Sequence, residues 1–211
     1  MNLVDKKIED YCLLHSHRPS DICQKIEDYT WKNVAIPQMV TGAMVGSYLG
    51  FLVKAIRAKN ILEVGTFTGY SALALAENTD GNVHTIDVDE ETTAIAKNFW
   101  KESKHGHKIT AHIGSGIDII PSFKEEFDFI FIDADKTNYL NYFELCFNKL
   151  AANGIMIFDN CLWSGKVLEK NGDARTEYLK KLNQFLANRT DLYTTLLPIR
   201  DGLMCVTRKL N

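Results

Sequence analysis

One stretch constrains the fold of this chain more than any other. Residues 61–76 read Ile-Leu-Glu-Val-Gly-Thr-Phe-Thr-Gly-Tyr-Ser-Ala-Leu-Ala-Leu-Ala. An apolar run, a turn containing Gly65 and Gly69, and an apolar helical pattern follow one another, which predicts strand, loop and helix. Glycine lets the backbone approach a ligand closely, and a helix beginning near Tyr70 directs its first N–H groups at the loop. The stretch therefore predicts a nucleotide-type binding loop, although a tight connection without a ligand gives the same pattern.

The loop differs from a dinucleotide site, in which three glycines let a pyrophosphate lie against the backbone. Here Thr66, Phe67 and Thr68 separate the two glycines. Glu63 would repel a pyrophosphate but attract an ammonium or sulfonium group. Asp87 ends the next apolar run, at the offset where such folds bind ribose hydroxyls. Together these residues favour S-adenosylmethionine over a nicotinamide dinucleotide as the ligand.

The composition is that of an ordinary globular protein. The 211 residues suffice for one domain with a full core, and 45% are hydrophobic and 24% charged. A net charge of -3 gives no signal for bulk nucleic-acid or membrane binding. The five cysteines are scattered, so we expect neither a disulfide framework nor a zinc site, and a reducing cytoplasm as the location. No apolar run reaches the about 18 residues that span a bilayer.

The periodicity predicts one α/β domain over residues 1–211, in which helices in 1–59 cover a sheet formed by 60–211. The expected helices are 3–14, 20–31, 41–57, 70–77, 92–104, a short one near 117, 139–150 and 176–186. Five strands are expected to be parallel, because helices alternate with them: 61–65, 83–87, 109–113, 127–133 and 155–159. Strands 193–197 and 203–208, joined by a tight link, predict an antiparallel hairpin at one edge.

Two of the predicted strands end in acids. Asp133 and Asp135 close one apolar run, and Asp159 and Asn160 close another. If these strands are neighbours, they lie about 4.8 Å apart, and Asp133 and Asp159 come within bridging distance of one cation. A divalent metal would relieve their repulsion, and Asn160 would add a neutral oxygen ligand. This set favours Mg²⁺, or Ca²⁺ or Mn²⁺, over zinc. The alternative is that each acid only caps a helix or turn.

Lys136 follows these acids closely. A lysine beside a divalent cation and a sulfonium has its charged form disfavoured, so it can act as a general base. The alternative is a solvated surface lysine.

Five stretches in combination resemble a known family: residues 62–71, 86–89, 131–136, 158–165 and 197–202. The chain resembles the metal-dependent class I O-methyltransferases, which include the catechol and caffeoyl-CoA O-methyltransferases, from about Gln38 to its C-terminus. The resemblance implies a Rossmann-like methyltransferase fold. It also implies a reaction in which a divalent metal chelates two vicinal hydroxyls of a small catechol-like aromatic and one of them receives the methyl group of S-adenosylmethionine.

The resemblance assigns a role to each matched residue. The implied cofactor-binding set is Thr41 (through its backbone), Glu63, Gly65, Thr66, Ser71, Asp87, Ser115, Gly116 and Asp133. The implied metal ligands are Asp133, Asp159 and Asn160. The implied catalytic residues are Lys136, which would be the base, and Asp133. Lys136 and Trp163 would face the substrate. The family also suggests a homodimer formed through the early helices.

Three features depart from the family pattern. Ser47 follows Gly46 where glutamine is usual, the segment 165–174 is shorter than the substrate loop of the plant enzymes, and no basic cluster marks a CoA phosphate site. We therefore expect a small catechol rather than a CoA thioester. Three other functions stay open: a tRNA enzyme that methylates a hydroxylated uridine, a nicotinamide-dependent oxidoreductase, and a non-catalytic cofactor-binding module.

Overall fold

A seven-stranded sheet forms the centre of the computed structural model, which describes residues 4–209, and its strand order is β3-β2-β1-β4-β5-β7-β6. The strands are β1 (Asn60–Val64), β2 (Asn82–Asp87), β3 (Ile109–Ile113), β4 (Phe127–Ile132), β5 (Leu150–Phe158), β6 (Leu192–Leu197) and β7 (Leu203–Arg208). The first five are parallel, and β7 pairs antiparallel with both β5 and β6. The predicted α/β fold with an antiparallel edge hairpin is confirmed.

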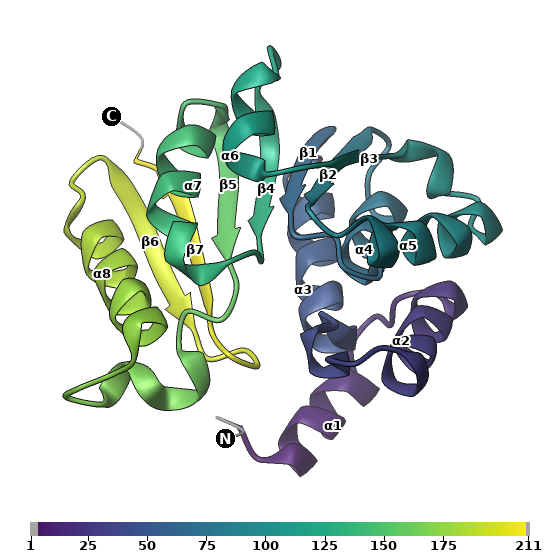
Figure 1. The fold of residues 1–211 in the computed structure, drawn as a ribbon, viewed down its shortest axis with the longest axis horizontal. Coiled ribbons are helices and arrows are strands. Elements are labelled where there is room, and N and C mark those ends of the chain that lie inside the picture. The colour runs from purple at the N-terminus through teal and green to yellow at the C-terminus, as the bar shows by residue number, and fades with distance from the viewer. Residues whose placement is uncertain (1–3, 210–211) are drawn as a thin grey trace.

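The helices lie in two layers, one on each face of the sheet (Figure 1). One layer holds α2 (Asp21–Asn33), α3 (Gly42–Ala55), α4 (Tyr70–Glu77) and α5 (Glu90–Glu102), with α1 (Lys6–Leu14) beside α3. The other holds α6 (Gly116–Ile119), α7 (Tyr139–Phe147) and α8 (Ala174–Asn188). The early helices therefore cover one face of the sheet, as the sequence predicts.

Strand periodicity divides the core into two clusters. On β4, Phe129 and Phe131 pack with α2–α5, whereas Ile130 and Ile132 pack with α6–α8. This follows because successive side chains of a strand point to opposite faces. All four side chains are fully buried, and each such burial contributes about 1.5–3 kcal/mol to folding.

Side-chain caps set several helix boundaries. The Ser20 hydroxyl accepts the Cys23 N–H and begins α2. The Asp89 carboxylate accepts the N–H groups of Glu91 and Thr92, so α5 begins at Glu90, two residues earlier than predicted. Leu3, the predicted start of the first helix, lies outside the described residues.

Two segments differ from the expected elements. β5 begins at Leu150 instead of residue 155, because Leu150 pairs with Phe127 across a register shift. A 3-10 segment, η5 (Trp163–Leu168), follows β5, and Trp163, Ser164 and Gly165 all have positive φ there. Within residues 4–209, no helix is both long enough and apolar enough to cross a membrane.

Candidate functional site

The site lies where the chain changes direction across the sheet. The chain proceeds from β1 outward to β3 and then returns to the other side of β1 as β4. Such a switch point leaves a crevice beyond the carboxyl ends of the two strands. The Gly65 N–H donates to Ile86 O and the Asp133 N–H donates to Val64 O, both at 2.8 Å. The glycine loop and the acids after β4 are therefore direct neighbours.

Gly65 is required by the protein backbone itself. Its φ is +105°, and a Cβ there would lie 2.0 Å from the Asp133 carbonyl oxygen. No side chain fits at that distance. The sequence predicts that Gly65 makes room for a ligand, and the structure adds that it makes room for the end of β4.

Asp87 holds the glycine loop in place. One carboxylate oxygen accepts the N–H groups of Thr66 and Phe67, each at 2.8 Å, and the other accepts the Asp89 N–H at 2.9 Å. Phe67 has φ +48°, a backbone conformation that these hydrogen bonds help to maintain. Asp87 thus has a structural role in addition to the predicted ribose contact, and its position at the end of β2 leaves that contact possible.

Glu63 is a fully buried carboxyl beneath this loop. The Thr85 hydroxyl donates to its Oε2 at 2.6 Å, whereas Oε1 has no hydrogen-bond partner among the described residues. Burial, reinforced by the charges of Asp133 and Asp87, raises the pKa of Glu63 to about 8, although nearby hydroxyls of Ser71 and Thr85 oppose the rise. A buried carboxyl with an unsatisfied oxygen fits a site that receives a cationic ligand.

The register of β4 and β5 brings the predicted metal ligands together. Ile132 pairs with Phe158, so Asp133 and Asp159 are the next residues on adjacent parallel strands. The Asp159 N–H also donates to Ile132 O at 3.0 Å. Both acids continue the alternation that directs Phe131 and Ile157 toward α2–α5. The expectation that these two strands are neighbours is confirmed.

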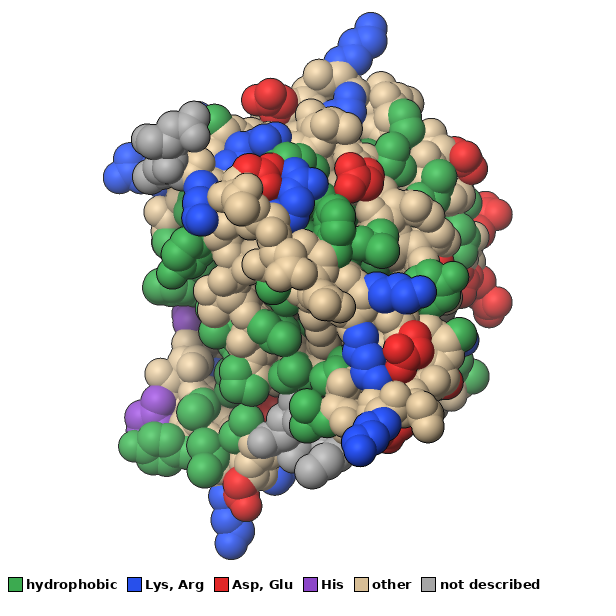
Figure 2. Space-filling view, turned by 90° about the vertical axis from the view of Figure 1, so that its left-hand side faces the viewer, with side chains coloured by type: hydrophobic (Ala, Val, Ile, Leu, Met, Phe, Trp, Pro, Cys, Tyr) green, Lys and Arg blue, Asp and Glu red, His purple; other side chains and the backbone are tan. Residues whose placement is uncertain are grey.

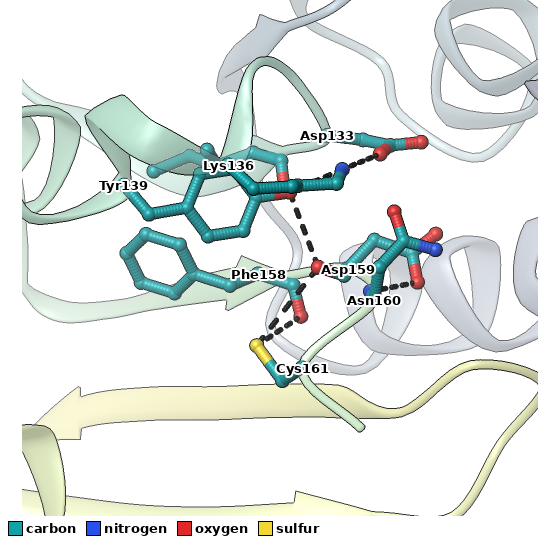
Figure 3. Close-up of polar contacts among 8 residues, drawn as sticks. Asp133, Lys136, Tyr139, Phe158, Asp159, Asn160 and Cys161 are labelled. Atoms are coloured by element: carbon teal, nitrogen blue, oxygen red, sulfur yellow. Dashed lines mark hydrogen bonds and ion pairs between the residues drawn. The ribbon is translucent and has the colours of Figure 1, made fainter. Parts of the chain in front are cut away.

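The carboxylates of Asp133 and Asp159 lie with the Asn160 amide on one side of the strand ends (Figure 3). Asp159 is 5% exposed. Burial, and then the charge of Asp133, raises its pKa to about 7, against the opposing effects of Lys136, the Asn160 N–H and Arg200. The Asn160 N–H donates to Asp159 Oδ1 at 2.6 Å, and the Asn160 side chain has no hydrogen-bond partner among residues 4–209. Two close carboxyls and an amide with unused hydrogen-bonding capacity fit a hard divalent cation.

The geometry is not that of a metal centre built from many charged ligands. Across residues 4–209, no three His, Cys, Asp or Glu side chains are grouped in a way that would hold a metal ion. The arrangement at β4 and β5 has only two carboxylates and one amide. A cation there would need further oxygen ligands from water or substrate, which is the coordination that Mg²⁺ commonly has.

Lys136 is paired with one of these acids. Its Nζ lies 2.8 Å from Asp133 Oδ1 and 2.7 Å from the Tyr139 hydroxyl (Figure 3). Its side chain is only 11% exposed, so the alternative of a solvated surface lysine is wrong. The ammonium group offsets part of the repulsion between the carboxylates. The sequence predicts the same effect for a bound metal.

The remaining predicted residues fall around the same crevice. Ser71 is buried in the first turn of α4, Gly116 is buried at the start of α6, and the Ser115 hydroxyl caps α6 by accepting the Ile117 N–H. Trp163 lies just after the metal-side acids, and its indole N–H is buried without a partner among the described residues. Thr41 is buried at the start of α3, whose first turn has no side-chain cap.

Tyr139 belongs to the site, although the sequence did not indicate it. The Tyr139 hydroxyl accepts from Lys136 and donates to the backbone carbonyls of Asp159 and Ile132. Its spacing of three residues from Lys136 was the available signal. Asp135 was expected at most to cap a turn, and it accepts the hydroxyl of Tyr142 at 2.6 Å and the side-chain amide of Asn138 at 2.6 Å.

A doubly wound sheet whose acids gather at the ends of β1, β2, β4 and β5 defines a Rossmann-like methyltransferase fold. The family model described as O-methyltransferase matches residues 14–209. A probable caffeoyl-CoA O-methyltransferase from Dictyostelium discoideum is 32% identical, over 97% of this chain and 93% of its own. A caffeoyl-CoA O-methyltransferase from Petroselinum crispum is 33% identical, over 81% of this chain and 77% of its own.

Solved structures agree with these relatives. A methyltransferase from Podospora anserina, bound to SAH, superimposes with a TM-score of 0.89 at 25% identity and covers 97% of this chain and 94% of its own. An O-methyltransferase from Streptomyces achromogenes has the same fold, with a TM-score of 0.88 at 24% identity over 97% of this chain and 96% of its own. The chain belongs to the O-methyltransferase family.

Proposed function

We propose that the protein transfers the methyl group of S-adenosylmethionine to a hydroxyl of a catechol-like aromatic, with a divalent cation at Asp133, Asp159 and Asn160. One observation carries the proposal: two carboxylates and an amide at adjacent strand ends share a crevice with Lys136 and with the glycine loop after β1.

The crevice supports S-adenosylmethionine in particular. The unsatisfied oxygen of Glu63 suits the cationic amino-acid end of this molecule. Val88, directly after Asp87, is 72% exposed at the carboxyl end of β2, where an apolar side chain would suit an adenine ring. The relative from Podospora anserina is bound to SAH, the demethylated form of the same cofactor. A nicotinamide dinucleotide has no comparable support.

A divalent cation, when bound, would lower the pKa of an acceptor hydroxyl beside it. The chain's own residues would do the rest. Asp133 and Asp159 would hold the cation and Asn160 would add a neutral ligand. Lys136 would leave Asp133 and release one proton from its ammonium group to solvent, and the neutral amine at Nζ would then accept the hydroxyl proton, while the Tyr139 hydroxyl keeps the amine in place. Trp163 would form a wall against the aromatic ring.

Positioning would provide much of the rate. Lys136 and the strand-end acids are fixed by buried elements, and Tyr139 and Asp159 are both at most 5% exposed. A rigid site that holds acceptor oxygen and methyl carbon in line can lower the barrier by about 7–11 kcal/mol.

The surface and the loop lengths favour a small acceptor. On the face formed by α8 and β6, Lys and Arg side chains are interspersed with Asp and Glu and form no continuous basic patch (Figure 2). The segment between η5 and α8 is only residues 169–173. A caffeoyl group is itself a catechol, so the caffeoyl-CoA relatives support the vicinal-hydroxyl chemistry without requiring this chain to bind CoA.

The test is label transfer from methyl-labelled S-adenosylmethionine to a panel of acceptors with Mg²⁺. The panel contains small catechols, phenols with a single hydroxyl, caffeoyl-CoA and tRNA. We expect transfer to a small catechol, less to caffeoyl-CoA, and none to phenols with a single hydroxyl. Transfer to tRNA alone, with a steep dependence on salt, would instead establish the nucleic-acid alternative. Transfer to none of these acceptors would refute the proposed function.

A further inference from the structure

The turn between β6 and β7 carries an arginine in an unfavourable backbone conformation. Arg200 has φ +49°, in the left-handed region that costs a non-glycine residue roughly 1 kcal/mol or more. Gly or Asn would occupy this position more easily. A strained arginine is therefore expected to contribute through its side chain.

The Arg200 side chain bonds to the segment that leads into α3. Its Nη1 donates to the carbonyl oxygen of Val40 at 2.9 Å and also to that of Thr41. A Cβ at Gly42 would lie only 2.8 Å from Nη1, so the glycine makes room for the guanidinium. Residues about 160 positions apart in the sequence are joined in this way.

The guanidinium also lies near the site. The turn that carries Arg200 is hydrogen-bonded to the segment after the metal-side acids: the Cys161 N–H donates to Gly202 O at 2.9 Å, and the Leu162 N–H donates to Asp201 O at 2.8 Å. Cys161 follows Asp159 and Asn160, the residues directly after β5. On the other side, α3 packs against Tyr70 at the start of α4, directly after the glycine loop, because a Cβ at Gly46 would lie 2.9 Å from the Tyr70 ring. The segment that Arg200 holds is therefore at the rim of the cofactor crevice.

The two hydrogen bonds fix the direction of two peptide groups. All peptide bonds of residues 4–209 are trans, so the C=O of Val40 points opposite to the N–H of Thr41, and the C=O of Thr41 opposite to the N–H of Gly42. While Arg200 binds the carbonyls, both N–H groups point away from it. Because the first turn of α3 has no side-chain cap, these N–H groups are available to an anion.

We propose that Arg200 is a positioning residue: by holding the carbonyls of Val40 and Thr41, it directs the N–H groups of Thr41 and Gly42 at the carboxylate of the bound cofactor's methionine moiety. This rests on the proposed function, since it requires that the crevice binds S-adenosylmethionine. Arg200 itself does not touch the reacting atoms.

The test is cofactor binding by calorimetry, which needs neither acceptor nor metal. Arg200→Gly removes the side chain and the backbone strain together. We expect the Kd for S-adenosylmethionine and for S-adenosylhomocysteine to rise about 10-fold, as expected for lost hydrogen bonds to a charged group. The affinity for 5′-methylthioadenosine, which has no carboxylate, should be unchanged. Arg200→Lys, which keeps a cation, should recover part of the affinity.

Arg57→Gly is the matched control. Arg57 is also exposed and has φ +55°, but it follows the far end of α3 and its side chain makes no hydrogen bond among the described residues. Its substitution should leave all three affinities unchanged. Equal weakening of S-adenosylmethionine and 5′-methylthioadenosine by Arg200→Gly, an unchanged Kd, or the same effect in Arg57→Gly would overturn the inference. Failure of the wild-type protein to bind S-adenosylmethionine would refute the proposed function instead.

Discussion

Lys136 shows how one residue can serve two states of the site. In the structure its ammonium group pairs with Asp133 and contacts the Tyr139 hydroxyl. A cation bound to Asp133 would compete with this pairing, because both positive charges need the same carboxylate. The role of Lys136 as a base thus depends on its release from Asp133.

Substitution of Lys136 separates its charge from its ability to accept a proton. Lys136→Arg keeps a cation beside Asp133, but a guanidinium stays protonated. We expect kcat to fall at least about 100-fold in both Lys136→Arg and Lys136→Ala, with the Kd for S-adenosylmethionine little changed. Lys97→Ala, an exposed lysine on α5, is the control. Wild-type kcat in Lys136→Arg would remove proton acceptance from the role of this residue.

Glu63 makes the stability of the cofactor-free protein depend on pH. Its folded pKa of about 8 exceeds the ordinary value of 4.5, so the folded state binds more protons than the unfolded state between these values. Stability is therefore lost as pH rises from about 4.5 to about 8. Glu63→Gln removes this titration. The difference between the Tm of this variant and the Tm of the wild type should be larger at pH of about 8.5 than at pH of about 5.5, by about 3 °C or more.

Thermal melts of the cofactor-free protein at the two pH values measure this difference. Glu126→Gln, at an exposed position, should show no such pH-dependent gain. If the Tm of Glu63→Gln and the Tm of the wild type fell equally as pH rises, Glu63 would be ionised in the folded protein.

At the scale of elements, Tyr139 joins β4, β5 and α7. Its hydroxyl lies 3.1 Å from the carbonyl oxygen of Asp159 and 2.7 Å from Lys136 Nζ, and the side chain is 1% exposed. Tyr139→Phe should lower the Tm by about 2 to 6 °C, because it leaves buried groups without a partner. It should also lower kcat severalfold, because Lys136 loses an acceptor that orients it.

Tyr178→Phe on α8 provides the comparison. Tyr178 is 41% exposed, and its hydroxyl makes no hydrogen bond among the described residues. Differential scanning calorimetry measures the Tm of both variants, and initial rates of methyl transfer give their kcat. Equal Tm and kcat for the two variants would show that the Tyr139 hydroxyl does not hold the strand ends.

The elements themselves were largely predictable because their periodicity is local. The strand at Ile61, the caps at Ser20 and the final hairpin follow from neighbouring residues alone. The start of β5 at Leu150 was not predictable, because Asn153 and Gly154 weaken the strand pattern and the pairing partner Phe127 is distant in sequence. Local patterns predict elements, whereas register shifts depend on tertiary pairing.

The sequence predicts which residues gather at the site, but not which hydrogen bonds each of them makes. The strand-end acids could be placed because parallel strands end at one edge of the sheet. The hydrogen bonds that Asp87 accepts from the glycine loop, and those that Arg200 donates to Val40, depend on side-chain directions across different elements. Such contacts have no signature in local sequence.

At the scale of the whole molecule, large apolar side chains are exposed on the early helices. Tyr11, Leu14 and Phe51 are each at least 64% exposed on α1 and α3, and Phe51 borders a cavity of about 610 Å³. We propose that this surface forms a homodimer, as the family resemblance suggests. Light scattering after size exclusion should give twice the chain mass of 23.9 kDa, and Phe51→Asp should shift the protein toward the monomer. A wild-type monomer at all concentrations would contradict the dimer.

Asp133, Asp159 and Asn160 are proposed to hold one divalent cation beside the methyl acceptor. The most direct measurement is the rate of methyl transfer to a small catechol after exhaustive treatment with EDTA, followed by titration with Mg²⁺. We predict that chelation abolishes transfer, that Mg²⁺ restores it in the wild-type protein, and that Asp159→Ala is not restored. Undiminished transfer by the chelated wild-type protein would contradict a role for the cation in the reaction.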